Sequence, residues 1–375
     1  MSQFWLIAVL SVFVVAVVFS GVLIPQILLI AFKKRLFDHV DGRKIHHGTV
    51  PRLGGMAFMP VVILSVSLLL GVTLVFDSTE VLMCLVSDMK SIAFLTSAVI
   101  VIYLVGLADD LIGVRYRGKF VAQIISGMLL LASGLCACHF YGALFIGDVP
   151  HWLGALFTVF LVVYVVNAIN FIDGVDGLAS GMSAIAFLCY GATFFIVGEY
   201  IYAAIAFAVL GTVVPFFYFN VFGDAKKRKK IFMGDTGSLT LGLLLCFFAV
   251  KLSQIGATVK DVNPMVLAYV PLFIPCIDVV RVVVGRIHRG ANPFKPDQTH
   301  IHHKMMATGL SQRVVMVLIL AMSMALILLN IVLSQVLDVN LILLFDILLW
   351  LGLNVVLSRF KKNRRDCDVT SQNAD

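Results

Sequence analysis

Residues 167–181 read NAINFIDGVDGLASG and separate two long apolar runs, one over 152–166 and the next beginning at Met182. Asn170, Asp173 and Asp176 therefore lie where a hydrophobic segment ends, among glycines that allow the backbone to approach a ligand closely. Carboxylate and amide oxygens are hard ligands that suit Mg²⁺. A polar turn at the water boundary would also place acids here, but three such side chains within seven residues exceed what a turn needs. The stretch predicts a ligand site at a membrane surface.

The composition is that of an integral membrane protein. Of 375 residues, 61% are hydrophobic and 13% are charged, and the mean hydropathy is +1.03. A soluble domain carries about a quarter charged residues. The apolar runs are continuous and have the length of helices, which excludes a transmembrane barrel of alternating ten-residue strands. We therefore predict an all-α polytopic membrane protein.

Eleven spanning helices are expected, and the chain over 1–360 is expected to form a single membrane domain followed by a disordered tail over 361–375. The predicted spans are 4–31, 54–76, 91–111, 119–138, 152–171, 178–197, 201–222, 236–254, 264–287, 312–335 and 340–358. Alternate loops and the C-terminal tail hold 25 of the 28 lysines and arginines. The positive-inside rule then predicts that the N-terminus lies outside and that the C-terminus and these loops face the cytoplasm. The net charge of +7 is mostly a topology signal and not the mark of a nucleic-acid-binding surface.

Clusters of acids, amides and histidines fall on the predicted cytoplasmic side. Lys44 precedes Pro51-Arg52-Leu53-Gly54-Gly55, and its loop is either a phosphate-binding segment or an ordinary basic loop. Asp109 and Asp110 end the third span, where adjacent carboxylates need compensating cations or a metal ion. A structural pair opposing the basic residues of the next loop, 112–119, is the alternative.

Asp235 lies between glycines at the start of the eighth predicted span, where it is either a ligand or a simple N-cap. Lys226 to Lys230 just before it favour contact with lipid headgroups. The loop 286–303 ends in His300-Ile301-His302-His303, which suits either zinc or phosphate oxygens. The His-Glu-x-x-His arrangement of a metalloprotease is absent from the sequence, and hard oxygen ligands elsewhere favour Mg²⁺.

Three further features are interpreted structurally. Asp278 and Arg281, three residues apart, predict an internal ion pair. Asp346, inside the last span, has no partner that the sequence identifies. Cys136 and Cys138 fall within the predicted span 119–138, and two residues apart in a helix they should point away from each other.

Four ordered motifs at span ends carry a resemblance to a known family. They are Asp109-Asp110, the run Asn167-Ala-Ile-Asn170 into Asp173-Gly-Val-Asp176-Gly, Phe232-Met-Gly-Asp235, and His-Ile-His-His at 300–303. With these motifs the chain resembles the polyprenyl-phosphate N-acetylhexosamine-1-phosphate transferases of the MraY/WecA type. The histidine motif has the form of the WecA branch, the bacterial transferases that act on UDP-GlcNAc and undecaprenyl phosphate.

The resemblance implies transfer of GlcNAc-1-phosphate from UDP-GlcNAc to undecaprenyl phosphate with release of UMP. It implies a multi-pass protein of the bacterial inner membrane with its active site on the cytoplasmic face. It also implies that the product is used for a surface polysaccharide such as O antigen or enterobacterial common antigen, and that the protein forms a homodimer. The expected partners are therefore the two substrates and the lipid bilayer, with no nucleic acid.

The resemblance also assigns residues. Asn170 and Asp235 are the implied ligands of Mg²⁺, for which Mn²⁺ can substitute. Asp109 and Asp110 are expected to position the lipid phosphate or help hold the metal. The implied uridine pocket includes Asp173, Asp176 and Phe232, and the implied phosphate contacts are Lys119, His300, His302 and His303. Catalytic roles are expected for the five aspartates together with His302 and His303, and substrate-binding roles for Lys44, Lys119, Asn167, Phe232, Arg286 and His300.

Two other classes of function share some of these features. A CDP-alcohol phosphotransferase also places aspartates and glycines at a span end, but its motif needs an arginine after the alanine where this chain has Ser180. A secondary transporter is expected to hold its polar residues near the middle of the membrane and not at one face.

Overall fold

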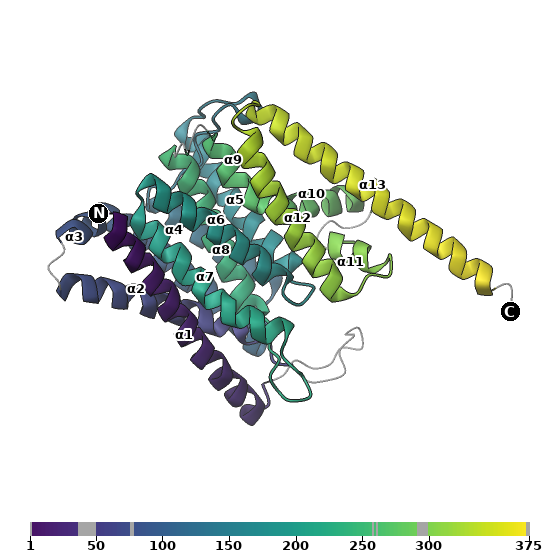
Figure 1. Ribbon diagram of the computed structural model, residues 1–375, viewed down its shortest axis with the longest axis horizontal. Helices are drawn as coiled ribbons and strands as arrows, with labels where there is room; N and C mark the ends of the chain where they lie inside the picture. Colours follow the sequence, from purple (N-terminus) through teal and green to yellow (C-terminus); the bar gives the residue numbers. More distant parts are fainter. Residues whose placement is uncertain are drawn as a thin grey trace.

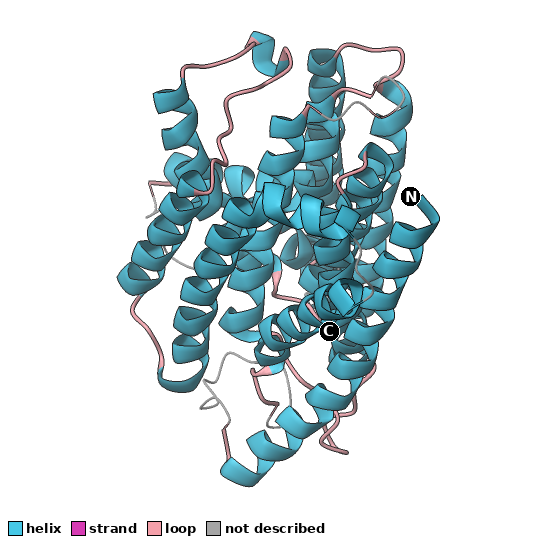
Figure 2. Cartoon of the chain, turned by 90° about the vertical axis from the view of Figure 1, so that its left-hand side faces the viewer, coloured by secondary structure: helices cyan, strands magenta, loops and turns pink. Residues whose placement is uncertain are grey.

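The computed structural model describes residues 2–36, 50–75, 79–256, 259, 262–290 and 299–372. These residues form helices joined by loops, and the extended segments among them make only the isolated bridges His139–Asp148 and Val259–Val262 (Figure 2). Apart from the groups at its two ends, a helix satisfies its backbone polar groups within one segment, which a chain this apolar requires inside lipid. The all-α architecture predicted from the sequence is confirmed.

The elements follow the chain in a simple order. The long α-helices are α1 (Ser2–Lys34), α2 (Phe58–Val75), α3 (Thr79–Ile112), α4 (Tyr116–Ala132), α5 (His151–Ile172), α6 (Leu178–Val197), α7 (Tyr200–Val221), α8 (Gly234–Ile255), α10 (Phe273–His288), α12 (Gln312–Leu333) and α13 (Val339–Gln372). The short elements are η1 (Gly54–Ala57), η2 (Ala143–Phe145), α9 (Pro264–Tyr269), η3 (Val270–Leu272) and α11 (Ile301–Met306).

Ten helical stretches in the described part of the chain are long and apolar enough to cross a membrane. Ten of the eleven predicted spans match them, and α6 has the predicted bounds of 178–197. The remaining predicted span, 119–138, overlaps α4, a helix of only 17 residues that begins at Tyr116 and ends at Ala132. Helix α13 continues beyond the predicted span and enters the predicted tail over 361–375, whose separation from the membrane domain stays a prediction.

Helix α8 lies at the centre of the bundle and contacts α3, α5, α6 and α9 (Figure 1). Within its apolar window 78% of the residues are buried, against 28% for α13, which runs along the edge of the molecule opposite α1. Glycines permit this close packing. A Cβ atom at Gly106 of α3 would lie 2.7 Å from Cα of Thr236, and one at Gly242 would lie 2.7 Å from Cα of Val166 in α5. The first turn of α8 is therefore fixed by its neighbours.

Backbone hydrogen bonds join the segment before α2 to the segment before α8. Phe232 N donates to Pro51 O at 2.9 Å, Gly54 N donates to Phe232 O at 2.9 Å, and Gly55 N donates to Met233 O at 2.8 Å. This backbone clasp, residues 51–55 with 232–233, places two segments that are far apart in the sequence side by side at one end of the bundle.

Two sequence interpretations were incomplete or wrong. Cys136 and Cys138 do not point apart, because α4 ends at Ala132 and both lie in the following turn, with their Sγ atoms 2.7 Å apart. Asp346 does have partners: its Oδ2 atom accepts hydrogen bonds from Tyr269 Oη at 3.0 Å and Asn330 Nδ2 at 2.7 Å. These partners come from α9 and α12, so only the tertiary packing identifies them.

Candidate active site

Asp110, in the last turn of α3, holds the N-terminus of α8. Its Oδ1 atom accepts a hydrogen bond from Asp235 N at 2.8 Å, and its Oδ2 atom accepts from Thr236 N at 2.9 Å and Thr236 Oγ1 at 2.5 Å. The first N–H groups of a helix lack partners within the helix, and negative charge is favourable beside them. Asp110 is thus a cap supplied by another helix, which leaves the Asp235 side chain available for other contacts.

The turn before α8 requires glycine at position 234. Its φ is +73°, a conformation that residues with a side chain rarely adopt. A Cβ atom there would lie 2.2 Å from Arg52 O and 2.5 Å from Asp110 Oδ2. Only glycine therefore fits at the start of α8, where the backbone passes close to the Asp110 carboxylate.

Lys119, from α4, joins two of the predicted catalytic aspartates. Its Nζ atom donates to Asp109 Oδ2 at 2.7 Å and also to Asp235 Oδ2. The other carboxylate oxygen of Asp109 accepts a hydrogen bond from Val114 N at 2.7 Å and so fixes the turn between α3 and α4. The ammonium group compensates two half-buried carboxylates that would otherwise repel each other.

Helix α5 contributes the amide side chains. Asn170 Nδ2 donates to Ser238 Oγ at 2.8 Å and lies 3.4 Å from Asp235 Oδ1. One turn earlier, Asn167 Nδ2 donates to Gln123 Oε1 at 2.8 Å and thereby links α5 to α4. We call the group Asp109, Asp110, Lys119, Asn170 and Asp235 the acidic centre. Asn170 belongs to it, whereas Asn167 lies outside it and supports it by linking α5 to α4.

The donor set of the acidic centre fits a divalent cation. Carboxylate oxygens of Asp109, Asp110 and Asp235 all lie within 4.8 Å of one another. The amide nitrogen of Asn170 is used by Ser238 and Asp235, so its carbonyl oxygen is the atom left to face an ion. Such oxygen atoms are the ligands that Mg²⁺ takes in proteins.

The turn after α5 forms a second group beside the acidic centre. Asp173 is half-buried, and burial together with the carboxylates of Asp235 and Asp176 raises its pKa well above the usual value. Asp176 Oδ2 accepts from Lys230 Nζ at 2.5 Å, and the same ammonium lies 5.8 Å from the centre of the Phe232 ring. The basic run 226–230 favours lipid contact for Lys230, but its side chain lies here instead.

The histidine segment, residues 299–303, is held by α10. Asp278 Oδ2 pairs with His300 Nδ1 at 2.8 Å, and Asp278 Oδ1 accepts from Ile301 N at 3.1 Å. Arg281 donates to Asp278 at 2.7 Å, which confirms the predicted ion pair, and to Thr299 O at 2.6 Å. The pair does more than balance charge, since it anchors the start of α11.

His302 lies against the 173–176 turn and is 1% exposed. A Cβ atom at Gly174 would lie 2.5 Å from its Nε2 atom. Neither ring nitrogen has a hydrogen-bond partner among the described residues. Burial and the neighbouring His303 lower its pKa to about 3, so the ring is neutral at pH 7. The histidine segment and the motif at 167–181 are therefore in contact. Both were predicted to lie on the same side of the membrane.

The remaining predicted site residues have varied positions. Lys44 lies outside the described residues. Arg286 is buried near the end of α10, and His303 packs with its ring centre 4.2 Å from that of His302. Sequence reasoning gave no role to Gln123, Thr236 or Ser238, because their contacts with the site residues form only when the helices are packed together.

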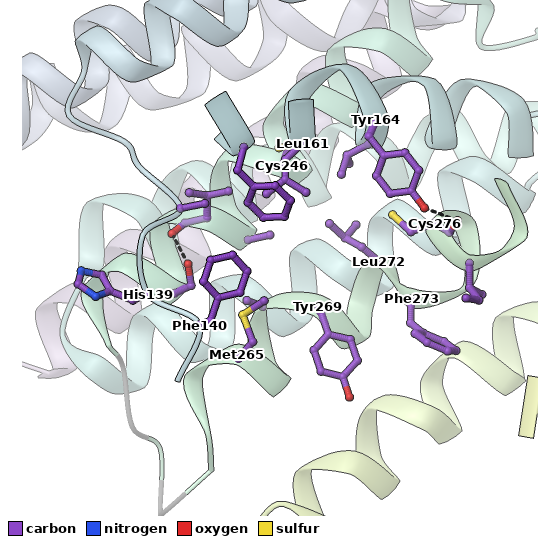
Figure 3. A pocket seen from close by; sticks show the side chains of 18 of the residues that line it. His139, Phe140, Leu161, Tyr164, Cys246, Met265, Tyr269, Leu272, Phe273 and Cys276 are labelled. Carbon is purple, nitrogen blue, oxygen red and sulfur yellow. Dashed lines mark hydrogen bonds between the residues drawn. The ribbon is translucent and has the colours of Figure 1, made fainter. Parts of the chain in front are cut away.

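An apolar pocket of about 250 Å³ lies between α5, α8, α9 and α10 (Figure 3). Phe140, Leu161, Tyr164 and Tyr269 are among the side chains that line it, and Tyr164 Oη donates to Cys276 O at 2.6 Å at one end. Tyr164 precedes Asn170 by six residues of the same helix, or about 9 Å along its axis. The pocket therefore begins within about two helical turns of the acidic centre and has the chemistry of a hydrocarbon site.

Known proteins resemble this chain over most of its length. Residues 92–253 match the model of glycosyl transferase family 4. An undecaprenyl-phosphate alpha-N-acetylglucosaminyl 1-phosphate transferase of Salmonella typhi is 27% identical over 84% of this chain and 81% of its own length. The protein of that name in Escherichia coli K12 is 26% identical over 77% and 74%. A probable undecaprenyl-phosphate N-acetylglucosaminyl 1-phosphate transferase of Bacillus subtilis is 27% identical over 82% and 80%.

Proposed function

We propose that this multi-pass membrane protein, which matches the model of glycosyl transferase family 4 over residues 92–253, transfers GlcNAc-1-phosphate from UDP-GlcNAc to undecaprenyl phosphate. The products are undecaprenyl-diphospho-GlcNAc and UMP. The observation that carries the proposal is the acidic centre, in which four helices bring carboxylates, an amide and a lysine to one end of the bundle. Phosphoryl transfer depends mainly on positioning and charge neutralisation, which such a group supplies.

The reaction joins two anions, so the site must overcome their repulsion. A phosphate monoester has a second pKa of about 6, and the lipid phosphate is therefore mostly a dianion at neutral pH that needs no strong base. One of its oxygens attacks the β-phosphorus of UDP-GlcNAc, and the bond to the UMP oxygen breaks. Lys119 lies where its ammonium group can compensate charge on the reacting phosphates. Asp110 holds Asp235 in position by accepting a hydrogen bond from its backbone N–H group.

We assign a Mg²⁺ ion, with Mn²⁺ as a substitute, to Asp235 and Asn170, with Asp109 beside them. When bound, the ion supplies charge neutralisation for the diphosphate and its leaving group.

The uridine end of the donor is assigned to the 173–176 turn. Phe232 offers a flat face for a base, and Lys230 beside it carries a charge suited to a phosphate. Asp173 and Asp176 offer oxygens to the N–H and hydroxyl groups of uridine. His302 and His303, which pack against one another above Gly174, are assigned to phosphate or sugar oxygens.

The acceptor lipid is assigned to the membrane side of the same site. The apolar pocket between α5 and α10 suits part of a polyprenyl chain, and its Tyr164 end is the nearer to Asn170. A charged phosphate would then reach the acidic centre while the chain stays in an apolar environment.

We further propose that the protein lies in the bacterial inner membrane with the acidic centre on the cytoplasmic side. The bias of 25 of 28 basic residues to one set of loops and the C-terminal tail supports this orientation. A homodimer and a role in the first membrane step of a surface polysaccharide of the O-antigen type complete the proposal.

The test is UMP release by the purified protein with undecaprenyl phosphate and a panel of UDP sugars, with Mg²⁺ present or chelated. We expect release with UDP-GlcNAc, loss on chelation, and a fall of at least about a thousandfold in Asp235→Asn. Asp224→Asn is the matched control, because Asp224 lies outside this centre in the 222–233 loop. CMP release from CDP-alcohols, or no UMP release from any UDP sugar, would refute the proposal.

A further inference from the structure

A second group of ligand-type side chains lies at the other end of α5, in the turn after α4. Cys138 N donates to Cys136 O at 3.0 Å, so the residues 136–138 form a three-residue turn. The turn places both thiols on the same side, with their Sγ atoms 2.7 Å apart. Both cysteines are free thiols. A spacing that would separate two side chains in a helix here brings them together.

His151, the first residue of α5, completes this group. Its Nδ1 atom lies 3.8 Å from Cys138 Sγ, and one donor atom from each of the three residues lies within 4.8 Å of the others. We call Cys136, Cys138 and His151 the thiol–imidazole cluster. Cys136 is buried and His151 is exposed, so the cluster reaches the protein surface on its histidine side.

The surrounding residues leave room for the sulfurs and hold the turn. A Cβ atom at Gly154 would lie 2.5 Å from Cys138 Sγ and 2.9 Å from Cys136 Sγ, so only glycine leaves this hollow. Thr158, one turn further along α5, accepts a hydrogen bond from Ala137 N at 2.9 Å through its hydroxyl oxygen. Gly154 and Thr158 both belong to α5, so this helix provides the space for the sulfur atoms and fixes the turn.

We propose that the thiol–imidazole cluster binds a soft or borderline d¹⁰ cation, Zn²⁺ or Cu⁺, through two thiolates and the imidazole. Sulfur and imidazole nitrogen are the ligands that such ions select. Binding releases the two thiol protons to solvent. Two sulfurs at about 2.3 Å from a tetrahedral zinc lie about 3.7–3.8 Å apart, so the thiols must open by about 1 Å. The third donor distinguishes this arrangement from a simple disulfide, in which His151 would have no part.

The ion acts as a structural link. His151 and Asn170 are nineteen residues apart on one helix, or about 28 Å along its axis, so the cluster does not touch the acidic centre. A bound ion would instead tie the turn after α4 to the start of α5. It would thus stabilise the loop 133–150 without taking part in transfer.

The test uses the full-length protein in detergent, reduced, freed of metal and then titrated with Zn²⁺ against a chromophoric chelator. We expect one ion per chain and a rise in the thermal unfolding temperature. The double variant Cys136→Ser/Cys138→Ser should bind at least about a hundredfold more weakly, and His151→Ala about tenfold more weakly. Cys189→Ser, whose thiol lies in α6, is the control that should bind as the wild type does. Co²⁺ should give a thiolate-to-metal absorption band that the double variant lacks.

Two results would overturn the proposal. Equal Zn²⁺ uptake by the wild type and the double variant would place the ion elsewhere. Protein kept without reductant that is lighter by two hydrogen atoms, and whose reduced form binds no ion, would show that the two cysteines form a disulfide instead. UMP release is recorded for each variant and should stay within about twofold of the wild type, which separates this inference from the proposed transferase function.

Discussion

The acidic centre and the histidine segment meet at one end of the bundle but differ in how their polar atoms are satisfied. In the acidic centre each carboxylate accepts from a backbone amide or from Lys119. In the histidine segment Asp278 is equally well paired, yet the buried ring of His302 has no hydrogen-bond partner among the described residues. Buried polar atoms are nearly always satisfied. The difference supports our proposal that the first region is organised before substrate arrives and that the second contacts the substrate.

Loss of Asp110 should have the largest effect, because it removes the charge that organises the first region. Asp110→Asn replaces one acceptor oxygen by an amide that faces the N–H groups of Asp235 and Thr236. We expect UMP release to fall about a thousandfold and the free energy of unfolding to fall by about 2–4 kcal/mol. Thermal unfolding and turnover of the purified variant measure both. Asp148→Asn, in the 139–150 loop, is the control; a stable Asp110→Asn protein with normal turnover would contradict the capping role.

Lys119→Met should have the next largest effect. It removes a charge from the acidic centre but keeps the hydrogen bonds by which Asp110 holds the start of α8. The change leaves the carboxylates of Asp109 and Asp235 without their compensating cation, so we expect turnover to fall about a hundredfold. Removal of a competing cation should also tighten the apparent affinity for Mg²⁺, by about tenfold. Turnover measured across a Mg²⁺ titration gives both quantities. An apparent affinity for Mg²⁺ that is unchanged or weaker than in the wild type would show that the lysine does not face the ion.

Gly174→Ala tests the second region at the point where the two regions touch. The added methyl group would occupy the space of His302 Nε2, so the ring must move away from the 173–176 turn. We expect kcat/KM for UDP-GlcNAc to fall about ten- to a hundredfold while the acidic centre keeps its Mg²⁺ dependence. Gly147→Ala adds a methyl group where no atom lies within 4 Å and serves as the control. Unchanged kinetics in Gly174→Ala would mean that the position of His302 does not matter.

The smallest effect concerns pH and follows from the pKa of His302. The ring is neutral in both folded and unfolded chains above about pH 6.5 and then contributes no pH dependence. Below that pH the unfolded chain takes up a proton that the buried ring, with a pKa of about 3, does not. Stability should therefore fall with falling pH, by at most about 1.4 kcal/mol per pH unit. Unfolding temperatures at pH 7.5 and 5.5 should differ less in His302→Gln than in the wild type; an equal difference would reject this assignment.

The spans and the polar clusters could be predicted because each leaves a local signal. Apolar runs give helices directly, and the bounds of α6 were predicted residue for residue. Contacts across the bundle leave no such signal. The capping of α8 by Asp110 joins residues 125 apart, and Lys230 could be separated from its basic run only by its contact with Asp176. The pair Cys136 and Cys138 was misinterpreted because an apolar run was extended six residues beyond the end of α4.

The backbone clasp between residues 51–55 and 232–233 determines when, during synthesis, the site comes into existence. Ribosomes add about 5–20 residues per second, and spans enter the membrane in the order in which they are made. Asp110 therefore waits about 6–25 seconds for the N–H groups of Asp235 and Thr236. Until α8 inserts, the first three spans hold adjacent carboxylates without their final partners, and the segment before α2 has no backbone to pair with. Insertion of α8 is thus the committing step of biogenesis, and a nascent chain that stalls before it presents quality-control proteases with an unfinished membrane domain.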